Sequence, residues 1–156
     1  MNGEITIEQV DPGDGTLIRL IARWYLREWD APVGKTVRRL SGQPDEDSLF
    51  HLVLRLDGEV VATGGLFNEV NIYNVHPRFR RYRPWVGLLY TREEFRGRGF
   101  GGMLLNEIEH RAQELGLSRL YLYTFTAESL YKRCGWTVMD RVPYKGHETA
   151  VMKKSI

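Results

Sequence analysis

A glycine-rich turn between an apolar run and an amphipathic segment is the feature that most constrains the fold. The apolar run covers residues 85–90, and the turn that follows reads Arg96-Gly97-Arg98-Gly99-Phe100-Gly101-Gly102. The first amides of a helix have no partner within the helix, and the helix dipole adds about half a positive charge there. Glycines let the backbone curl around an anion, and arginines add cationic charge. The pattern therefore predicts a strand, a phosphate-binding turn and a helix.

Other phosphate-binding motifs share parts of this pattern. Gly97, Gly99 and Gly102 satisfy the dinucleotide fingerprint G-x-G-x-x-G, but the next apolar run ends Tyr123-Thr124-Phe125, without the acidic residue that the fingerprint needs. A P-loop is excluded because no Gly-Lys-Ser/Thr follows the glycines. A turn that merely joins two elements is the structural alternative, although each ordered glycine would cost about 0.5 to 1 kcal/mol.

Two motifs of the chain resemble the GCN5-related N-acetyltransferase (GNAT) family. Arg96, Gly99 and Gly101 match the family's acetyl-CoA signature, Arg/Gln-x-x-Gly-x-Gly/Ala. A later motif, a tyrosine just before a Gly-aromatic pair, is matched by Tyr131 and Gly135-Trp136. The resemblance implies an enzyme that transfers the acetyl group of acetyl-CoA to a primary amine. The acceptor would be a small molecule or a peptide or protein N-terminus, attacking directly in a ternary complex without a metal.

The resemblance also implies where the coenzyme lies. Leu89 and Tyr90 would offer main-chain groups to the pantetheine arm, and one strand amide would polarise the thioester carbonyl. Thr124 stands where many family members have an asparagine that touches the pantetheine, and its hydroxyl can make one hydrogen bond there. The implied acetyl-CoA site consists of Leu89, Tyr90, Arg96, Gly97, Arg98, Gly99, Phe100, Gly101, Gly102 and Thr124.

Tyr131 matches the family's general acid, which protonates the departing thiolate. A phenol with an ordinary pKa of about 10 is protonated at neutral pH and can donate, although a core aromatic would show the same pattern. The run 85–90 lacks the glutamate base that family members often carry. Glu69 is the first candidate base and His147 or Glu148 the second, and each would also fit a solvated surface position. An exposed amine could instead lose its proton to water.

A catalytically silent acyl-CoA-binding or regulatory domain is the alternative function, since a fold does not determine an activity. The stretch 71–84 adds a separate question, because its arginines alternate with aromatic residues. These arginines could be solvated, or could contact an acidic substrate or a coenzyme phosphate. Stacking on single-stranded nucleic acid is a further reading, but the stretch lacks a recognisable module, so we expect no nucleic-acid partner. The arginines are Arg78, Arg80, Arg81 and Arg83.

Composition sets the remaining expectations. A chain of 156 residues with net charge +2 is expected to form one domain over 1–156, without needing disulfides or metals. The single cysteine, Cys134, is expected to be a small buried filler. The four histidines lack the spacing of a zinc motif. The sequence shows no signal-peptide or membrane-spanning run, which predicts a cytoplasmic protein without a membrane partner. It leaves the oligomeric state open, a homodimer included.

Hydrophobic periodicity predicts the element order β-α-α-β-β-β-α-β-α-β-β. A strand is expected around 5–10, a helix over 16–29 with Thr16 as N-cap, and a shorter helix at 35–40. Asp57-Gly58 predicts a hairpin between strands at 50–56 and 59–66. These hairpins precede a single βαβ unit, which implies a mixed sheet.

The helix after the glycines is expected to be amphipathic, with Leu115 on its apolar face, Glu109 on another face and Gly116 as its stop. A strand at 120–124, a short helix at 128–134 and two strands within 136–152 complete the chain. The fold class expected from the resemblance is α/β (α+β mixed), with helices flanking a mostly antiparallel sheet of about seven strands.

Overall fold

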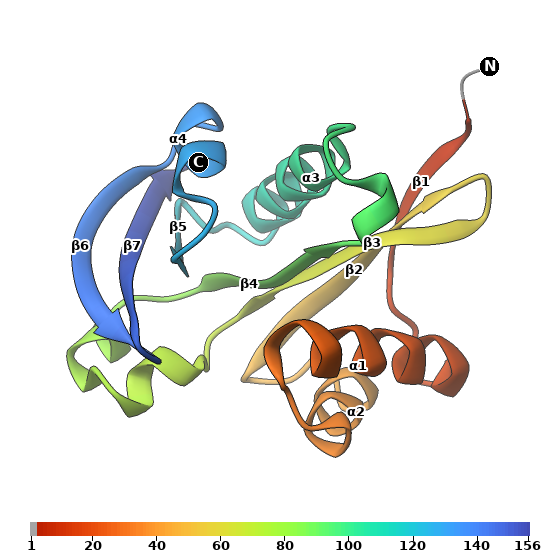
Figure 1. Ribbon diagram of the computed structural model, residues 1–156, viewed down its shortest axis with the longest axis horizontal. Coiled ribbons are helices and arrows are strands. Elements are labelled where there is room, and N and C mark those ends of the chain that lie inside the picture. The colour runs from red at the N-terminus through yellow and green to blue at the C-terminus, as the bar shows by residue number, and fades with distance from the viewer. Residues whose placement is uncertain (1–2) are drawn as a thin grey trace.

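A single mixed sheet organises the computed structural model, which describes residues 3–156 (Figure 1). Its strand order is β1-β2-β3-β4-β5-β7-β6, and every neighbouring pair is antiparallel except β4 and β5. The strands are β1 (Ile5–Gln9), β2 (Ser48–Leu56), β3 (Glu59–Phe67), β4 (Trp85–Thr91), β5 (Arg119–Thr124), β6 (Thr137–Tyr144) and β7 (His147–Ser155). The predicted fold class and the predicted mixed sheet are confirmed.

Helices cover both faces of this sheet. In Figure 1, α1 (Gly15–Trp29) and α2 (Val33–Ser41) lie on one side of β2–β4, while α3 (Phe100–Glu114) lies on the other, with α4 (Glu128–Arg133) beside β5–β7. The predicted order of helices and strands is confirmed. Three short 3₁₀ helices add to it, at Asn71–Asn74, Pro77–Arg81 and Glu93–Phe95.

The two parallel strands meet at only one point. Trp85 of β4 pairs with Tyr121 of β5, where the Tyr121 amide donates to the Pro84 carbonyl at 3.1 Å. Beyond this point β5 turns steeply away from β4 (Figure 1). From Val86 onward, the edge of β4 that faces β5 therefore has no strand partner, and this interruption of the hydrogen-bonded ladder is called here the gap between β4 and β5.

A bulge interrupts β4 beside this gap. Leu88 has φ of 56°, in the left-handed region, and the pairing with β3 shifts between Thr63↔Tyr90 and Gly65↔Gly87. A bulky residue in this conformation costs on the order of 1–3 kcal/mol and persists only where its surroundings hold it. Leu88 is therefore a strained position at the centre of the sheet.

The α3 face shows two departures from the expected amphipathic pattern. Leu115 is 59% exposed, because α3 ends at Glu114 and Leu115 follows its last turn. Glu109 is buried, because it faces β7 and forms an ion pair with the Lys154 ammonium at 2.6 Å. Both predictions were wrong because helical periodicity shows neither where a helix ends nor which charged residue finds a buried partner. The rest of the apolar face is confirmed, with Leu104, Leu105, Ile108 and Ala112 buried.

Local chemistry corrects two smaller predictions. Asp14, not Thr16, caps α1, because its carboxylate accepts from the Leu17 amide at 3.1 Å. Cys134 is half-buried against the core that α3 covers, rather than fully buried. Across residues 3–156, no helix is long and apolar enough to cross a membrane, and no cluster of three or more His, Cys, Asp or Glu side chains could hold a metal ion.

Candidate functional site

The turn before α3 is built by glycines in the left-handed region. Gly97 has φ of 77° and Gly99 has φ of 86°, values that side chains rarely adopt. A Cβ added at Gly97, Gly99 or Gly102 would meet no atom within 4 Å. Glycine is thus needed here for backbone conformation, and the space beside the turn is open to a ligand.

The first amides of α3 point out of this turn without partners in the helix. The first intrahelical bond runs from the Met103 amide to the Gly99 carbonyl at 3.1 Å, and no side chain caps the helix start. The amides of Phe100, Gly101 and Gly102 therefore precede the helical hydrogen bonds. Together with the helix dipole, they make this end of the 15-residue helix suited to an anion.

The two arginines of the turn make different contacts. Arg96 folds back on β4, where its Nε donates to the Thr91 carbonyl at 2.8 Å and its guanidinium lies 5.4 Å from the Tyr90 ring. Arg98 is exposed and lies 5.2 Å from the ring of Phe100, without an ion pair in the described chain. Arg96 thus supports the turn, whereas the charge of Arg98 is not neutralised by a carboxylate within residues 3–156.

Three further predicted contacts can contribute mainly through the backbone. The Phe100 ring is buried in the core beneath α3, so only its main chain faces the turn. Leu89 packs on that same core, whereas Tyr90 stacks on Trp24 of α1 at 5.6 Å. The side chains of Leu89 and Tyr90 therefore leave β4 on opposite faces, and the backbone between them borders the gap.

Thr124 and Tyr131 are linked by the turn between β5 and α4. The Thr124 hydroxyl oxygen accepts from the Ala127 amide at 3.0 Å, which fixes the start of α4. Tyr131 on α4 is only 9% exposed and meets Trp136 edge-on at 6.3 Å between ring centroids. Burial raises the pKa of Tyr131 to about 12, so the phenol keeps its proton at neutral pH. This state is the one that an acid requires.

The candidate bases are found in two other parts of the structure, the segment after β3 and the β6–β7 hairpin. Glu69 follows β3 and forms an exposed ion pair with Arg80 at 3.3 Å. His147 stacks on Phe125 with ring centroids 4.0 Å apart, directly after the end of β5. With Glu148, His147 lines a hollow of about 400 Å³ on the β6–β7 hairpin. The roles of all three remain predictions.

The arginine stretch is partly neutralised by neighbouring carboxylates. Arg78 pairs with Asp140 at 2.9 Å, and Arg80 pairs with Glu69. The Arg78 guanidinium also lies 4.6 Å from the centroid of the buried Phe79 ring. The Arg78–Asp140 pair ties the 3₁₀ helix Pro77–Arg81 to β6, and the side chains of both ion pairs are solvent-exposed, which fits a solvated surface loop.

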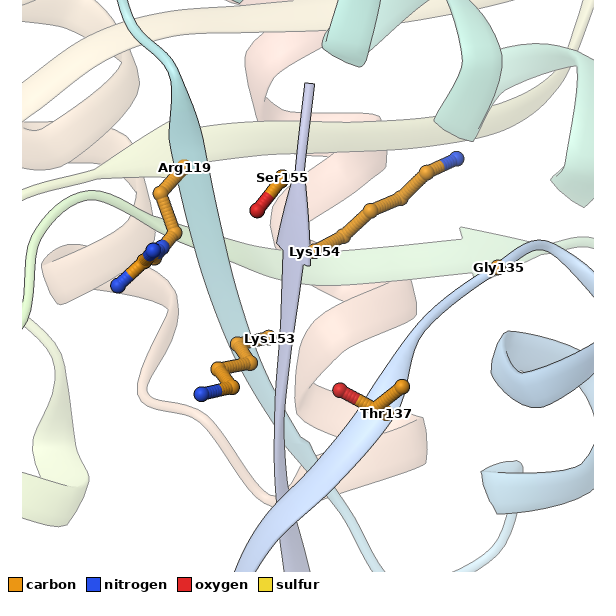
Figure 2. A pocket seen from close by; sticks show the side chains of 6 residues that line it. All are labelled: Arg119, Gly135, Thr137, Lys153, Lys154 and Ser155. Atoms are coloured by element: carbon orange, nitrogen blue, oxygen red, sulfur yellow. The ribbon is translucent and has the colours of Figure 1, made fainter.

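A separate basic hollow lies on β5, β6 and β7 (Figure 2). It has a volume of about 330 Å³ and is lined by Arg119, Gly135, Thr137, Lys153, Lys154 and Ser155. Figure 2 shows Arg119 and Lys153 extending to one side while Lys154 extends to the other. No predicted site residue lines this hollow, so it is distinct from the turn before α3.

A buried hydrogen-bonded network, which the sequence did not reveal, holds the bulge of β4. The Tyr25 hydroxyl on α1 donates to the Leu88 carbonyl at 2.6 Å, and the Thr63 hydroxyl donates to the Leu52 carbonyl at 2.9 Å. His51 Nε2 lies 3.0 Å from both hydroxyl oxygens. When both hydroxyl protons point to carbonyls, the fitting tautomer of His51 carries its proton on Nε2 and shares it between the two hydroxyl oxygens.

Burial keeps His51 neutral. Burial, and then the nearby charge of Arg39, lower the pKa of His51 to about 3. The Nδ1 atom is buried without a partner, which fits the tautomer that carries its proton on Nε2. No local signal in the sequence marks these residues, because Tyr25 sits in a helical stripe and His51 in an apolar strand. Only the tertiary fold brings them to Leu88.

Comparisons with known proteins identify the family and the fold. The family model "Acetyltransferase (GNAT) family" matches residues 18–136. An aminoglycoside 6′-N-acetyltransferase complexed with coenzyme A is 12% identical, with a TM-score of 0.76 over 96% of each chain. YncA from Salmonella typhimurium, with its cofactor acetyl-CoA, is 16% identical, with a TM-score of 0.74 over 97% of this chain and 94% of its own.

A GNAT-family acetyltransferase from Streptococcus pneumoniae is 20% identical, with a TM-score of 0.73 over 98% of this chain and 99% of its own. At these identities the structural likenesses show the fold. Among curated proteins, no significant match was found.

Proposed function

Because the chain belongs to the acetyltransferase (GNAT) family, we propose that it is an N-acetyltransferase. The acetyl group of acetyl-CoA would pass to a primary amine of a small molecule or a peptide or protein N-terminus, by direct attack in a ternary complex. The observation that carries this proposal is the open turn at Gly97–Gly102, with uncommitted amides beside the gap between β4 and β5.

The residues present fit acetyl-CoA. The amides of Phe100, Gly101 and Gly102 and the charge of Arg98 suit a pyrophosphate. The edge of β4 beyond Trp85 offers main-chain groups to a pantetheine arm, which carries amides of its own. Two structures with the same fold are complexes with acetyl-CoA or coenzyme A, which supports the same assignment.

The chemistry requires one bond to form and one to break. The amine nitrogen attacks the thioester carbonyl carbon, the C–N bond forms, and the C–S bond breaks. A main-chain amide at the bulge of β4 would stabilise the charge that develops on the carbonyl oxygen. Tyr131 would donate its phenolic proton to the departing thiolate. The proton of the amine would leave to Glu69, to His147 or Glu148, or to water.

A catalytically silent acyl-CoA-binding domain is the competing function. Retention of a protonated phenol on α4 favours catalysis over this alternative. The proposed setting is the cytoplasm, with an amine substrate as partner and neither nucleic acid nor membrane. The near-balanced charge of +2 supports the absence of a polyanion partner.

A screen of amine acceptors tests this proposal. Each amine is mixed with the protein and acetyl-CoA, and the release of coenzyme A thiol is followed against a control without amine. We expect at least one primary amine to accelerate thiol release and to gain an acetyl group, detectable by mass spectrometry. Binding of acetyl-CoA without turnover on any amine would favour the silent domain.

A further inference from the structure

Arg39 on α2 differs from the other sheltered cations of the chain. In the described part of the chain, five lysine or arginine residues are partly buried: Arg39, Arg55, Arg92, Arg111 and Lys154. The last four pair with glutamates at 2.6–3.0 Å, whereas no ion pair of Arg39 occurs within residues 3–156. Withdrawing a cation from water without a counter-charge is unfavourable. Arg39 is only partly buried, so its guanidinium is both unpaired within residues 3–156 and open to a counter-charge from outside the chain.

Arg39 lies one aromatic ring away from the bulge of β4. Its guanidinium carbon is 5.2 Å from the centroid of the Phe67 ring. That ring packs against Gly87, where an added Cβ would lie 3.1 Å from it, and its centroid is 5.8 Å from that of His51. Gly87 directly precedes Leu88, so Arg39 borders the region where the thioester is expected.

The polar groups that feel the charge of Arg39 are neutral and come from three elements. Arg39 acts electrostatically on Tyr25 of α1, His51 of β2 and Tyr123 of β5. Burial raises the pKa values of both tyrosines, so neither phenol ionises near neutral pH to neutralise the guanidinium. Arg39 thus stands among uncharged groups on both sides of the gap between β4 and β5.

Arg39 lies on the face of the sheet opposite the turn before α3, so it can contact the acceptor rather than the pyrophosphate. The turn that suits the pyrophosphate opens α3, which covers one face, while Arg39 lies on the α1–α2 face. A thioester held along this unpaired edge of β4 would leave the opposite, α1–α2 face of the sheet to the acceptor. An acceptor amine arriving there comes within the surroundings of Arg39.

We propose that Arg39 binds a carboxylate of the acceptor, so that the substrate is an amine with a carboxylate close to it. A guanidinium presents paired donors that match a carboxylate, and charge-assisted bonds of this kind are strong. A free amino acid supplies this chemistry, and so does a peptide N-terminus that begins with an acidic residue. The inference rests on the proposed acetyltransferase function.

Matched acceptor pairs test the inference. Amino acids are compared with their C-terminal amides, and peptides beginning with Asp or Glu with those beginning with Asn or Gln. We expect the carboxylate member of at least one pair to have the higher kcat/KM. Arg39→Gln should lower that kcat/KM about 10- to 100-fold and reduce the preference within the pair towards one, while acetyl-CoA affinity is retained. The kcat/KM of Arg39→Lys for the carboxylate acceptor should lie between those of the wild type and Arg39→Gln.

Arg38→Gln is the matched control, because Arg38 is the exposed neighbour on the same helix. This variant should keep the preference for the carboxylate. Turnover without any carboxylate preference, or a preference that survives Arg39→Gln, would overturn the inference while leaving the acetyltransferase function in place.

A binding readout separates the two hypotheses where no turnover occurs. The melting temperature of the protein with coenzyme A is measured with and without each acceptor. Stabilisation by carboxylate acceptors that Arg39→Gln abolishes would support the inference even if transfer fails. Neither turnover nor stabilisation by any carboxylate acceptor would overturn it.

Discussion

The turn before α3 and the Tyr25–His51–Thr63 network flank the same strand but are built in opposite ways. The turn consists of consecutive residues, with glycines in open space and amides that bond to nothing in the helix. The network joins three buried side chains from α1, β2 and β3, and its two hydroxyl protons are committed to carbonyls. Uncommitted groups suit a region that receives a ligand, whereas committed groups suit one that holds a strained strand in place.

The largest expected effect comes from placing a side chain in the open turn before α3. Gly99→Asp places bulk and negative charge at the expected pyrophosphate position, so we expect acetyl-CoA affinity to fall at least about 100-fold, with a cooperative melt retained. Gly116→Asp is the control, since Gly116 at the other end of α3 also has a positive φ, of 82°, and open space. Calorimetric titration of both variants that gives equal, near-normal affinities would place the phosphates elsewhere.

Tyr131 gives the next largest effect. Tyr131→Phe should lower kcat roughly 10- to 1000-fold while KM and melting temperature stay close to normal, because only the donated proton is lost. Burial raises the pKa of Tyr131 to about 12, so ionisation of this phenol should not reduce the wild-type rate below about pH 10. Tyr121→Phe, at another buried tyrosine, serves as the control. Full activity in a folded Tyr131→Phe protein would remove Tyr131 from the mechanism.

The network should act on turnover through the position of the bulge. Tyr25→Phe removes the hydrogen bond to the Leu88 carbonyl and should lower kcat about 10-fold and stability by about 1–3 kcal/mol, with acetyl-CoA affinity nearly unchanged. Tyr73→Phe is the matched control, because its buried hydroxyl donates to the Tyr82 carbonyl at 2.8 Å, away from the bulge. If both variants lose stability equally and neither loses turnover, Tyr25 has only a structural role.

The smallest expected effect is a pH dependence of stability. His51 has its pKa lowered from 6.5 to about 3, so below pH 6.5 the unfolded chain takes up a proton that the folded chain refuses. Stability should then fall by about 1.4 kcal/mol per pH unit as the pH drops. Between about pH 6.5 and 5, carboxylates contribute little, since their ordinary pKa values are about 4. Denaturant titrations of His51→Gln should show a shallower slope, and an identical slope would contradict the assignment.

Prediction of structure from sequence succeeded where the signal is local. The turn at Gly97–Gly102 and the helix after it lie in one short segment, so spacing alone indicates them. Tyr25, His51 and Leu88 meet only because α1, β2 and β4 pack together. The spacing of residues in the sequence does not indicate this tertiary contact. Glu109 was placed on the wrong face for the same reason, since its partner Lys154 lies on β7. The candidate bases also remain open, because their roles depend on the position of the acceptor.

Titration of the protein with acetyl-CoA by calorimetry, with NADH as the comparison ligand, tests the central claim most directly. The open turn and its uncommitted amides predict saturable binding of acetyl-CoA, a higher melting temperature in its presence, and no such effect of NADH. Absence of acetyl-CoA binding, or equal binding of NADH, would contradict the assignment of the turn before α3 as an acetyl-CoA site.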